Sequence, residues 1–228
     1  MVGSGGRVPS DSNHAEEGAA LALLLADSSD AFYRGLFDPV GAESRDEGVN
    51  LLAITFDDTA DEWFDAWRRR SDGSHPGEMT VALVGAQFRS ATETPAVQSF
   101  DEQTDGAVTI ETIESPTDFA AVGALISNYL LDWQSSDAHS VVYLSSLTTL
   151  VESASPEKAF QLLSRLRRRF GNEDRVAYVR QDRNRYEEDR LGQFDRLFDV
   201  IVTAEEGELV AYESDSRSAE REPGSSFD

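Results

Sequence analysis

Eight short apolar runs constrain the fold of this chain more than any other feature of its sequence. Most are continuous and do not alternate with polar residues, which is typical of strands buried on both faces of a parallel sheet. They span residues 20–26, 49–55, 80–84, 108–113, 141–144, 176–179, 200–203 and 208–212. The pattern therefore predicts a mostly parallel central sheet.

Helical patterns lie between several of these runs. Residues 60–70 follow Thr59, which is suited to cap a helix. Residues 116–133 carry an apolar stripe at helical spacing, and residues 156–170 follow Ser155, another capping residue type. Strands that alternate with helices predict an α/β fold, here a three-layer sandwich with right-handed crossovers.

Two polar segments flank the predicted domain. Residues 1–18 and 214–228 contain Gly, Ser and acidic residues without periodicity, so we expect disordered tails on a single domain of residues 19–213. Residues 90–106 are also polar and predict a loop. No apolar run approaches the ~18 residues of a membrane span, and the first residues lack the order of a signal peptide. We therefore expect a cytoplasmic protein that does not bind membranes.

The charge of the chain bears on its habitat and partners. Its 43 acidic and 20 basic residues give a net charge of −23, and Lys158 is its single lysine. An acidic surface with Arg in place of Lys is typical of a halophilic cytoplasm, where molar salt shortens the Debye length to ~3 Å and screens the repulsion. The same charge opposes binding to phosphate backbones, so we do not expect a nucleic-acid partner.

The first candidate site follows the first apolar run, because open α/β sheets bind ligands at the carboxyl ends of their strands. A phosphate loop would place Gly and Lys here, whereas this chain has Asp27, Ser28 and Ser29. The carboxylate of Asp27 would repel a phosphate group. We therefore expect Ser28 or Ser29 to cap a helix instead.

The second candidate site is the acid pair Asp57 and Asp58 after the second run. Adjacent carboxylates can hold a divalent cation or orient a water molecule. In so acidic a chain, a solvated cap before the Thr59 helix is the commoner arrangement. Ser145, after the fifth run, begins a hydroxyl-rich segment without a carboxylate for Mg²⁺. We therefore expect no metal, no cofactor and no catalytic residue.

Two arginine clusters, 68–70 and 165–169, end predicted helices, where cations complement the helix dipole. On so acidic a chain, such a cluster could also bind an acidic partner or a second copy. The three histidines, at positions 14, 75 and 139, have no partner at ligand spacing.

Three phrases of the sequence resemble the RecA/KaiC-like ATPase fold, most closely a haloarchaeal group of degenerate KaiC-like proteins. They are residues 51–58 (LLAITFDD), 113–133 (IESPTDFAAVGALISNYLLDW) and 141–151 (VVYLSSLTTLV), and the resemblance covers roughly residues 20–205. It implies a RecA/KaiC-like α/β domain.

The resemblance also implies which elements of an active relative are missing. Such relatives carry a Gly-Lys-Ser/Thr loop after the first strand, where this chain has Asp27. They carry a Mg²⁺-associated Asp at the position of Ser145. Their paired acids, which activate water, correspond to Asp57 and Asp58. The resemblance therefore implies the fold without the ATPase.

Three functions remain open on this reasoning. The leading one is a non-catalytic regulatory or signalling module that associates with a protein partner or with itself. The second is a nucleotide-binding protein or weak ATPase in which Arg34 or Arg180 replaces the missing lysine, since arginine binds phosphate well. The third is a transcription-associated regulator, although no basic recognition helix is apparent.

Overall fold

The computed structural model describes residues 21–26, 49–68, 77–85, 97–98, 108–170, 175–185, 192–205 and 208–213. The two predicted tails lie outside these residues. The side chains at the edges of some ranges, among them those of residues 66–68, are outside the description as well.

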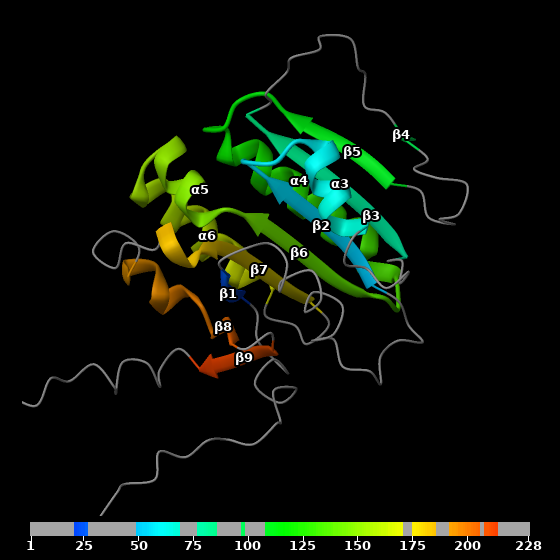
Figure 1. The fold of residues 1–228 in the computed structure, drawn as a ribbon. Coiled ribbons are helices and arrows are strands. Elements are labelled where there is room, and N and C mark those ends of the chain that lie inside the picture. Colours follow the sequence, from blue (N-terminus) through cyan, green and yellow to red (C-terminus); the bar gives the residue numbers. More distant parts are fainter. Residues whose placement is uncertain are drawn as a thin grey trace, which may run out of the picture.

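The described strands form a single nine-stranded sheet in the order β4-β5-β3-β2-β6-β7-β1-β8-β9 (Figure 1). All strand contacts from β5 to β8 are parallel, and only β4 and β9 pair antiparallel to their neighbours. The strands are β1 (Leu21–Ala26), β2 (Val49–Thr55), β3 (Glu78–Val84), β4 (Val97–Gln98), β5 (Val108–Ile113), β6 (His139–Ser145), β7 (Arg175–Asp182), β8 (Val200–Glu205) and β9 (Glu208–Glu213). The predicted α/β fold with a central parallel sheet is confirmed, and each of the eight apolar runs forms a strand.

The sequence prediction differs from the structure at β4. Residues 90–106 were predicted as a loop, but Val97 and Gln98 pair with Thr109 and Val108 of β5. Two residues are too short to show the period-2 pattern of a strand. Strands β6 and β7 are longer than the apolar runs that predicted them. Their polar end residues are not part of an apolar pattern but still pair with the neighbouring strands.

Four α-helices and three short 3-10 helices are described. The α-helices are α3 (Ala60–Arg68), α4 (Phe119–Asp132), α5 (Leu147–Ser153) and α6 (Pro156–Arg169), and the 3-10 helices are η1 (Trp133–Ser135), η2 (Arg183–Arg185) and η3 (Gly192–Leu197). Thr59 caps α3 as predicted: its hydroxyl accepts from Glu62 N at 3.3 Å, and its backbone N–H donates to Glu62 Oε2 at 2.9 Å. This reciprocal arrangement is a capping box.

Two helices depart from the prediction. The helix predicted to open at Pro116 begins instead at Phe119, because Asp118 supplies the N-cap, with Asp118 Oδ1 accepting from Ala121 N at 2.9 Å. Helix α5 was not predicted. Its seven residues include two threonines and a serine, and they are too few to show a clear helical period.

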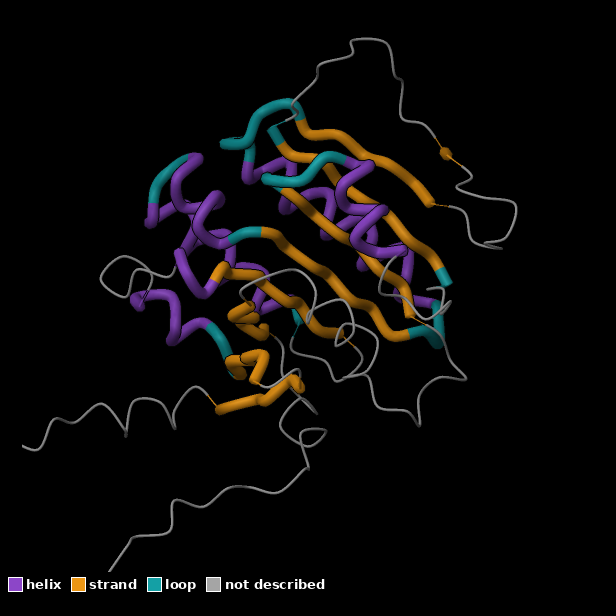
Figure 2. Tube along the Cα trace, in the orientation of Figure 1, coloured by secondary structure: helices purple, strands orange, loops and turns teal. Residues whose placement is uncertain are grey.

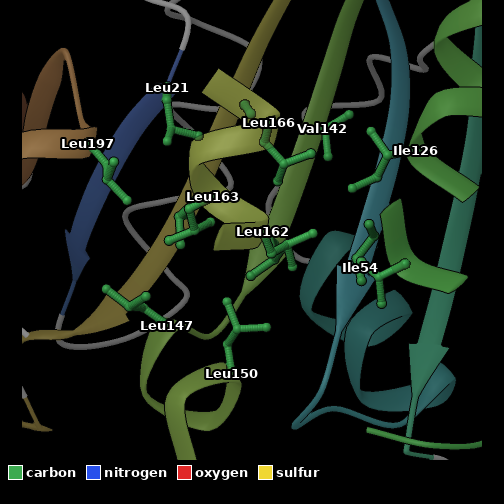
Figure 3. Close-up of a cluster of buried hydrophobic side chains, with 14 of the residues drawn as sticks. Leu21, Ile54, Ile126, Val142, Leu147, Leu150, Leu162, Leu163, Leu166 and Leu197 are labelled. Atoms are coloured by element: carbon green, nitrogen blue, oxygen red, sulfur yellow. The ribbon is translucent and has the colours of Figure 1, made fainter. Parts of the chain in front are cut away.

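One face of the sheet is covered by α4, α5, α6 and η3 (Figures 1 and 2). Leu162, Leu163 and Leu166 of α6 project from one side of the helix into this layer (Figure 3). They meet residues of the central strands such as Ile54 and Val142. These leucines explain why α6 is strongly amphipathic and why its opposite side carries arginines.

The other face carries a second buried cluster. Trp63 and Phe64 of α3 pack edge to face, with their ring centroids 5.5 Å apart. Strand residues that point to this face include Leu51, Val141 and Tyr143. Alternate residues of each central strand therefore enter opposite layers, which accounts for the continuous apolar runs in the sequence.

Candidate functional site

Three polar side chains stand next to one another across the carboxyl ends of the central strands. Thr55 of β2 is in register with Ser145 of β6, and Ser145 is in register with Arg180 of β7. Thr55 and Ser145 are buried, and Arg180 is half-buried. This edge is where an open parallel sheet binds ligands, so we take it as the candidate site.

The acid pair begins directly after β2. The Thr55 hydroxyl accepts from the backbone N–H groups of Asp57 at 3.3 Å and Asp58 at 3.0 Å. The same hydroxyl donates to Asp58 Oδ2 at 3.1 Å. Thr55 therefore closes the turn that leads into α3, and it holds the Asp58 carboxylate next to the end of β2.

Burial is the main influence on the pKa of Asp58. It raises this pKa above the ordinary value for an aspartate, because a charged carboxylate loses hydration in a half-buried position. The hydrogen bond from Thr55 and the charge of Arg180 act in the opposite direction, while the nearby Asp57 and Glu62 add to the rise. The Arg180 guanidinium thus lies close enough to Asp58 to act as a partial counter-charge.

Asp57 is exposed and points to the neighbouring helix α5. Its Oδ1 accepts from the Thr149 hydroxyl at 2.5 Å. Thr149 also contacts Ser146, the N-cap of α5, with the two hydroxyl oxygens 3.1 Å apart. The carboxylate of Asp57 therefore connects the end of β2 to the first turn of α5.

Arg180 and Ser145 form the centre of the row. Arg180 Nη1 donates to Ser145 Oγ at 3.3 Å. The Nε of Arg180 is buried and has no hydrogen-bond partner among the described residues. Next to them, Tyr143 is buried on the same side of β6, and burial raises the pKa of its phenol while the charge of Arg180 opposes the rise. Arg180 therefore places a half-buried positive charge in the middle of this row.

A second polar contact lies on the opposite side of the same strand ends. Gln181 is fully buried, and its Oε1 accepts from both the N–H and the hydroxyl of Thr148, at 2.9 and 2.8 Å. Its Nε2 donates to the carbonyl of Asp182 at 2.9 Å. Gln181 therefore anchors the start of α5 to β7 with each of its polar atoms in use.

The structure brings together half of the predicted site residues. Asp57, Asp58, Ser145 and Arg180 lie at the same edge, as the rule for strand ends predicts. The remaining candidates, Asp27, Ser28, Ser29 and Arg34, lie outside the described residues.

Sequence reasoning missed the partners of these residues. Thr55, Thr148 and Thr149 were not assigned a role, although the Ser146-x-x-Thr149 spacing with a polar residue at its start is a signal for a helix cap. Among the described residues, no three His, Asp or Glu side chains are grouped to hold a metal ion. No described helix is long and apolar enough to cross a membrane.

Comparison with known proteins identifies the family. The model of DUF7504, a family of unknown function, matches residues 20–204, which is most of the chain. The chain belongs to this family. A search of curated proteins finds no match.

Among solved structures, the chain is similar to one from Pyrococcus horikoshii OT3, described only as a structural study, with 11% sequence identity and a TM-score of 0.49. The alignment covers 86% of each chain. At this level the similarity assigns no function to the DUF7504 chain.

Chemically, the polar groups of this edge make hydrogen bonds within the chain. Asp57 and Asp58 accept from threonine hydroxyls, and the Ser145 hydroxyl accepts from Arg180. Each carboxylate uses one oxygen in these bonds, and an ionised carboxyl has further lone pairs. The arrangement joins strand ends to helix starts, and Arg180 places a positive charge beside Ser145 and Asp58.

Proposed function

We propose that this DUF7504 chain is a non-catalytic RecA/KaiC-like module of a halophilic archaeon that acts through association with proteins, in regulation or signalling. The arrangement of the strand ends supports this proposal. By the resemblance, the strands that carry the phosphate loop, the water-activating acids and the Mg²⁺-associated acid correspond to β1, β2 and β6. All three belong to one set of parallel strands, so their carboxyl ends meet at one edge.

The observation that carries the proposal is the environment of Ser145. By the resemblance, this residue corresponds to the Mg²⁺-associated acid of active relatives. It is fully buried and accepts a hydrogen bond from Arg180. A neutral hydroxyl provides little to bind Mg²⁺. A guanidinium at hydrogen-bond distance repels a divalent cation from the same place.

The second support is the engagement of the acid pair. Asp57 accepts from Thr149 and Asp58 accepts from Thr55, so each carboxylate has a structural contact that accounts for it without a role in activating water. Both carboxylates hold the loop between β2 and α3 in place. In this proposal the acids are structural.

ATP turnover tests the proposal. Purified wild-type chain and the Asp57→Asn/Asp58→Asn variant are incubated with Mg-ATP in molar KCl, and released phosphate is measured. We expect both to match the protein-free rate, with unchanged circular dichroism and an unchanged association state. Turnover by the wild type that the double variant loses contradicts the proposal, because the acids would then be catalytic.

Nucleotide binding is a second candidate function, favoured by one observation. Arg180 presents a half-buried guanidinium at the edge, and its Nε has no hydrogen-bond partner among the described residues. Arginine is a good partner for phosphate. Titration with ATP in the absence of Mg²⁺ tests this candidate: saturable binding that Arg180→Gln abolishes, with the fold preserved, supports it. Equal heats for both proteins and for buffer reject it.

A further inference from the structure

Three arginines end helix α6 at the edge of the sheet where the parallel strands begin. They are Arg167, Arg168 and Arg169, and all three are exposed. Arg167 lies on the β8 side of this edge, since it donates to the carboxylate of Asp199 just before that strand. Arg169 lies on the α4 side, since its Nη1 donates to Ser127 Oγ. The three side chains, which we call the arginine row, therefore lead from β8 towards α4.

An exposed leucine follows the arginine row. Leu131 stands one turn beyond Ser127 on α4 and is 65% exposed, the one large hydrophobic side chain so open among the described residues. The same helix presents Ala124 and Asn128, which are exposed and uncharged. Followed from β8, this surface offers positive charge first and apolar area second.

The C-terminal segment, residues 214–228, follows β9 at the same edge. Strand β9 runs antiparallel to β8, and its last residue, Glu213, pairs with Val200, the first residue of β8. Helix α4 ends near this edge too, because the indole of Trp133 donates to Glu78 at the start of β3. The segment itself lies outside the described residues, but β9 sets the place where it begins.

The segment is long enough to cross from β9 to α4. Strands β9 and β3 are six steps apart in the sheet (Figure 1), about 29 Å at the ~4.8 Å spacing of neighbouring strands. The fourteen residues from 214 to 227 span about 46 Å when extended. The excess allows the segment to rise from the sheet edge to the helix layer.

The order of residues in the segment matches the order of the surface. The acids Glu220 and Glu222 come first, and the single aromatic residue of the segment, Phe227, comes after them. In an extended chain, alternate side chains point the same way. Glu220 and Glu222 then share one side, and the two arginines of the segment, at 217 and 221, share the other.

We propose that the C-terminal segment binds this surface of its own chain, with Glu220 and Glu222 on the arginine row and Phe227 on Leu131. Exposed ion pairs each contribute little free energy. The covalent tether compensates, because a short linker holds the segment at an effective concentration on the order of millimolar. Since the contact lies within one chain, the inference goes beyond the proposed function and does not depend on it.

The N-terminal residues match the surface less well. Residues 1–20 precede β1 at the same edge and include Glu16 and Glu17. They contain no aromatic side chain to cover Leu131. A second copy lacks the tether and carries the same net charge of −23, so repulsion opposes it. The C-terminal segment therefore combines the charge, the apolar group and the tether.

The bound segment acts as a displaceable cover. It neutralises part of the arginine row and shields Leu131 from water, which removes an exposed apolar side chain from the surface. An acidic protein partner must displace the segment before it reaches the same arginines. The contact therefore selects for partners that bind this side of the chain more tightly than its own segment does.

Distances between spin labels test the contact, since the chain has no cysteine of its own. The full chain carries nitroxide labels at Ser226→Cys and Ala124→Cys, and pulsed electron paramagnetic resonance measures their separation. In a second pair, Ser226→Cys is combined with Asp65→Cys on α3, at the opposite face of the sheet. An excess of unlabelled chain in each sample suppresses signals between copies, and circular dichroism verifies the fold.

We expect one narrow distance peak for the first pair and a longer, broader distribution for the second. Phe227→Ser and Leu131→Ser are each expected to broaden the first distribution and shift it to longer distances. Both residues contribute apolar area to the proposed contact, and Leu131 is exposed, so its replacement leaves the core intact.

Charge reversal tests the arginine row. The variant Glu220→Arg/Glu222→Arg is expected to broaden the first distribution at moderate salt. The effect should be smaller in molar KCl, where the Debye length is ~3 Å. The control variant Asp61→Arg/Asp65→Arg changes the net charge by the same amount on α3 and is expected to leave the peak in place.

Four results overturn the inference. A first distribution that is already as broad as that of Phe227→Ser means that the segment is not bound. A narrow peak that neither Phe227→Ser nor Leu131→Ser changes places the segment elsewhere. A narrow peak for labels at Ser12→Cys and Ala124→Cys, with a broad one for Ser226→Cys, makes the N-terminal residues the occupant. A peak that the unlabelled excess removes makes a second copy the occupant.

Discussion

The two edges of the parallel sheet hold their polar groups in the same manner. At the amino edge, Asp199 accepts from the backbone N–H of Leu21 at 3.0 Å and from Arg167 at 2.5 Å, and the Trp133 indole N–H donates to Glu78 at 2.7 Å. At the carboxyl edge, threonine hydroxyls donate to Asp57, Asp58 and Gln181. The amino edge of such a sheet is a structural region, and the carboxyl edge is where ligands bind.

In a working α/β enzyme the two edges differ, because hydrogen-bond donors and acceptors at the carboxyl edge stay unpaired for a substrate, at some cost in stability. The similarity of the two edges in this chain is therefore informative. Here the carboxyl edge uses its donors and acceptors to join β2, β6 and β7 to α5. The exception is Arg180, whose Nε has no partner among the described residues.

Replacing Gln181 with leucine is expected to have the largest effect on stability. Leucine cannot accept from Thr148, so an N–H and a hydroxyl lose their acceptor in a buried position. We expect the free energy of unfolding to fall by about 2–4 kcal/mol, measured by denaturant titration. A loss below about 0.5 kcal/mol would show that Gln181 is not a structural anchor.

At the opposite edge, the matched change is Trp133→Phe. It keeps an aromatic ring against Tyr129, whose ring centroid lies 5.4 Å away, and removes the indole donor to Glu78 together with part of the buried ring volume. We expect a loss of about 1–3 kcal/mol in the same titration. If this loss greatly exceeds that of Gln181→Leu, the carboxyl edge is the weaker structural region and the comparison fails.

A smaller effect is expected for the helix cap at the carboxyl edge. Ser146→Ala removes the acceptor for Thr149 N, as Ser155→Ala does for Lys158 N at the start of α6. Each change should cost about 1 kcal/mol. Similar losses for the two variants indicate that Ser146 is an ordinary cap. A gain in stability for Ser146→Ala alone would indicate a residue retained for a ligand.

The smallest effect is the pH dependence that Asp58 contributes. Its pKa is raised in the folded chain, chiefly by burial, so the folded state holds this proton to a higher pH than the unfolded state. The stability that the group contributes is therefore present below its unfolded pKa and lost as pH rises through the folded pKa.

Comparison with Asp58→Asn isolates this contribution, because the other carboxylates titrate in both proteins. We expect the stability of the wild type relative to the variant to fall as pH rises from about 4, and to level off once the folded carboxyl has ionised. Denaturant titrations of both proteins from pH 3.5 to 7 measure the difference. A relative stability that rises over this range would mean that the hydrogen bond from Thr55 and the charge of Arg180 together outweigh burial.

The strands were predictable because their apolar runs are continuous, and the sheet edge was predictable because it follows from them. Asp57, Asp58, Ser145 and Arg180 were found by the rule that strand ends meet. Their hydrogen bonds were not, since Thr55, Thr149 and Gln181 are hydroxyl and amide residues that sequence places equally well in solvent. The contacts of Thr149 and Gln181 depend on the short helix α5, whose seven residues are too few to show a helical period.

The central claim, that this fold has lost its nucleotide, is tested most directly by thermal unfolding in molar KCl with and without Mg-ATP. A ligand that binds only the folded chain adds ~2.7 kcal/mol at 100 times its dissociation constant, or roughly 5–10 °C for a chain of this size. We predict cooperative unfolding at the same temperature in both conditions. A reproducible upward shift that Arg180→Gln removes would contradict the account and make the carboxyl edge a nucleotide site.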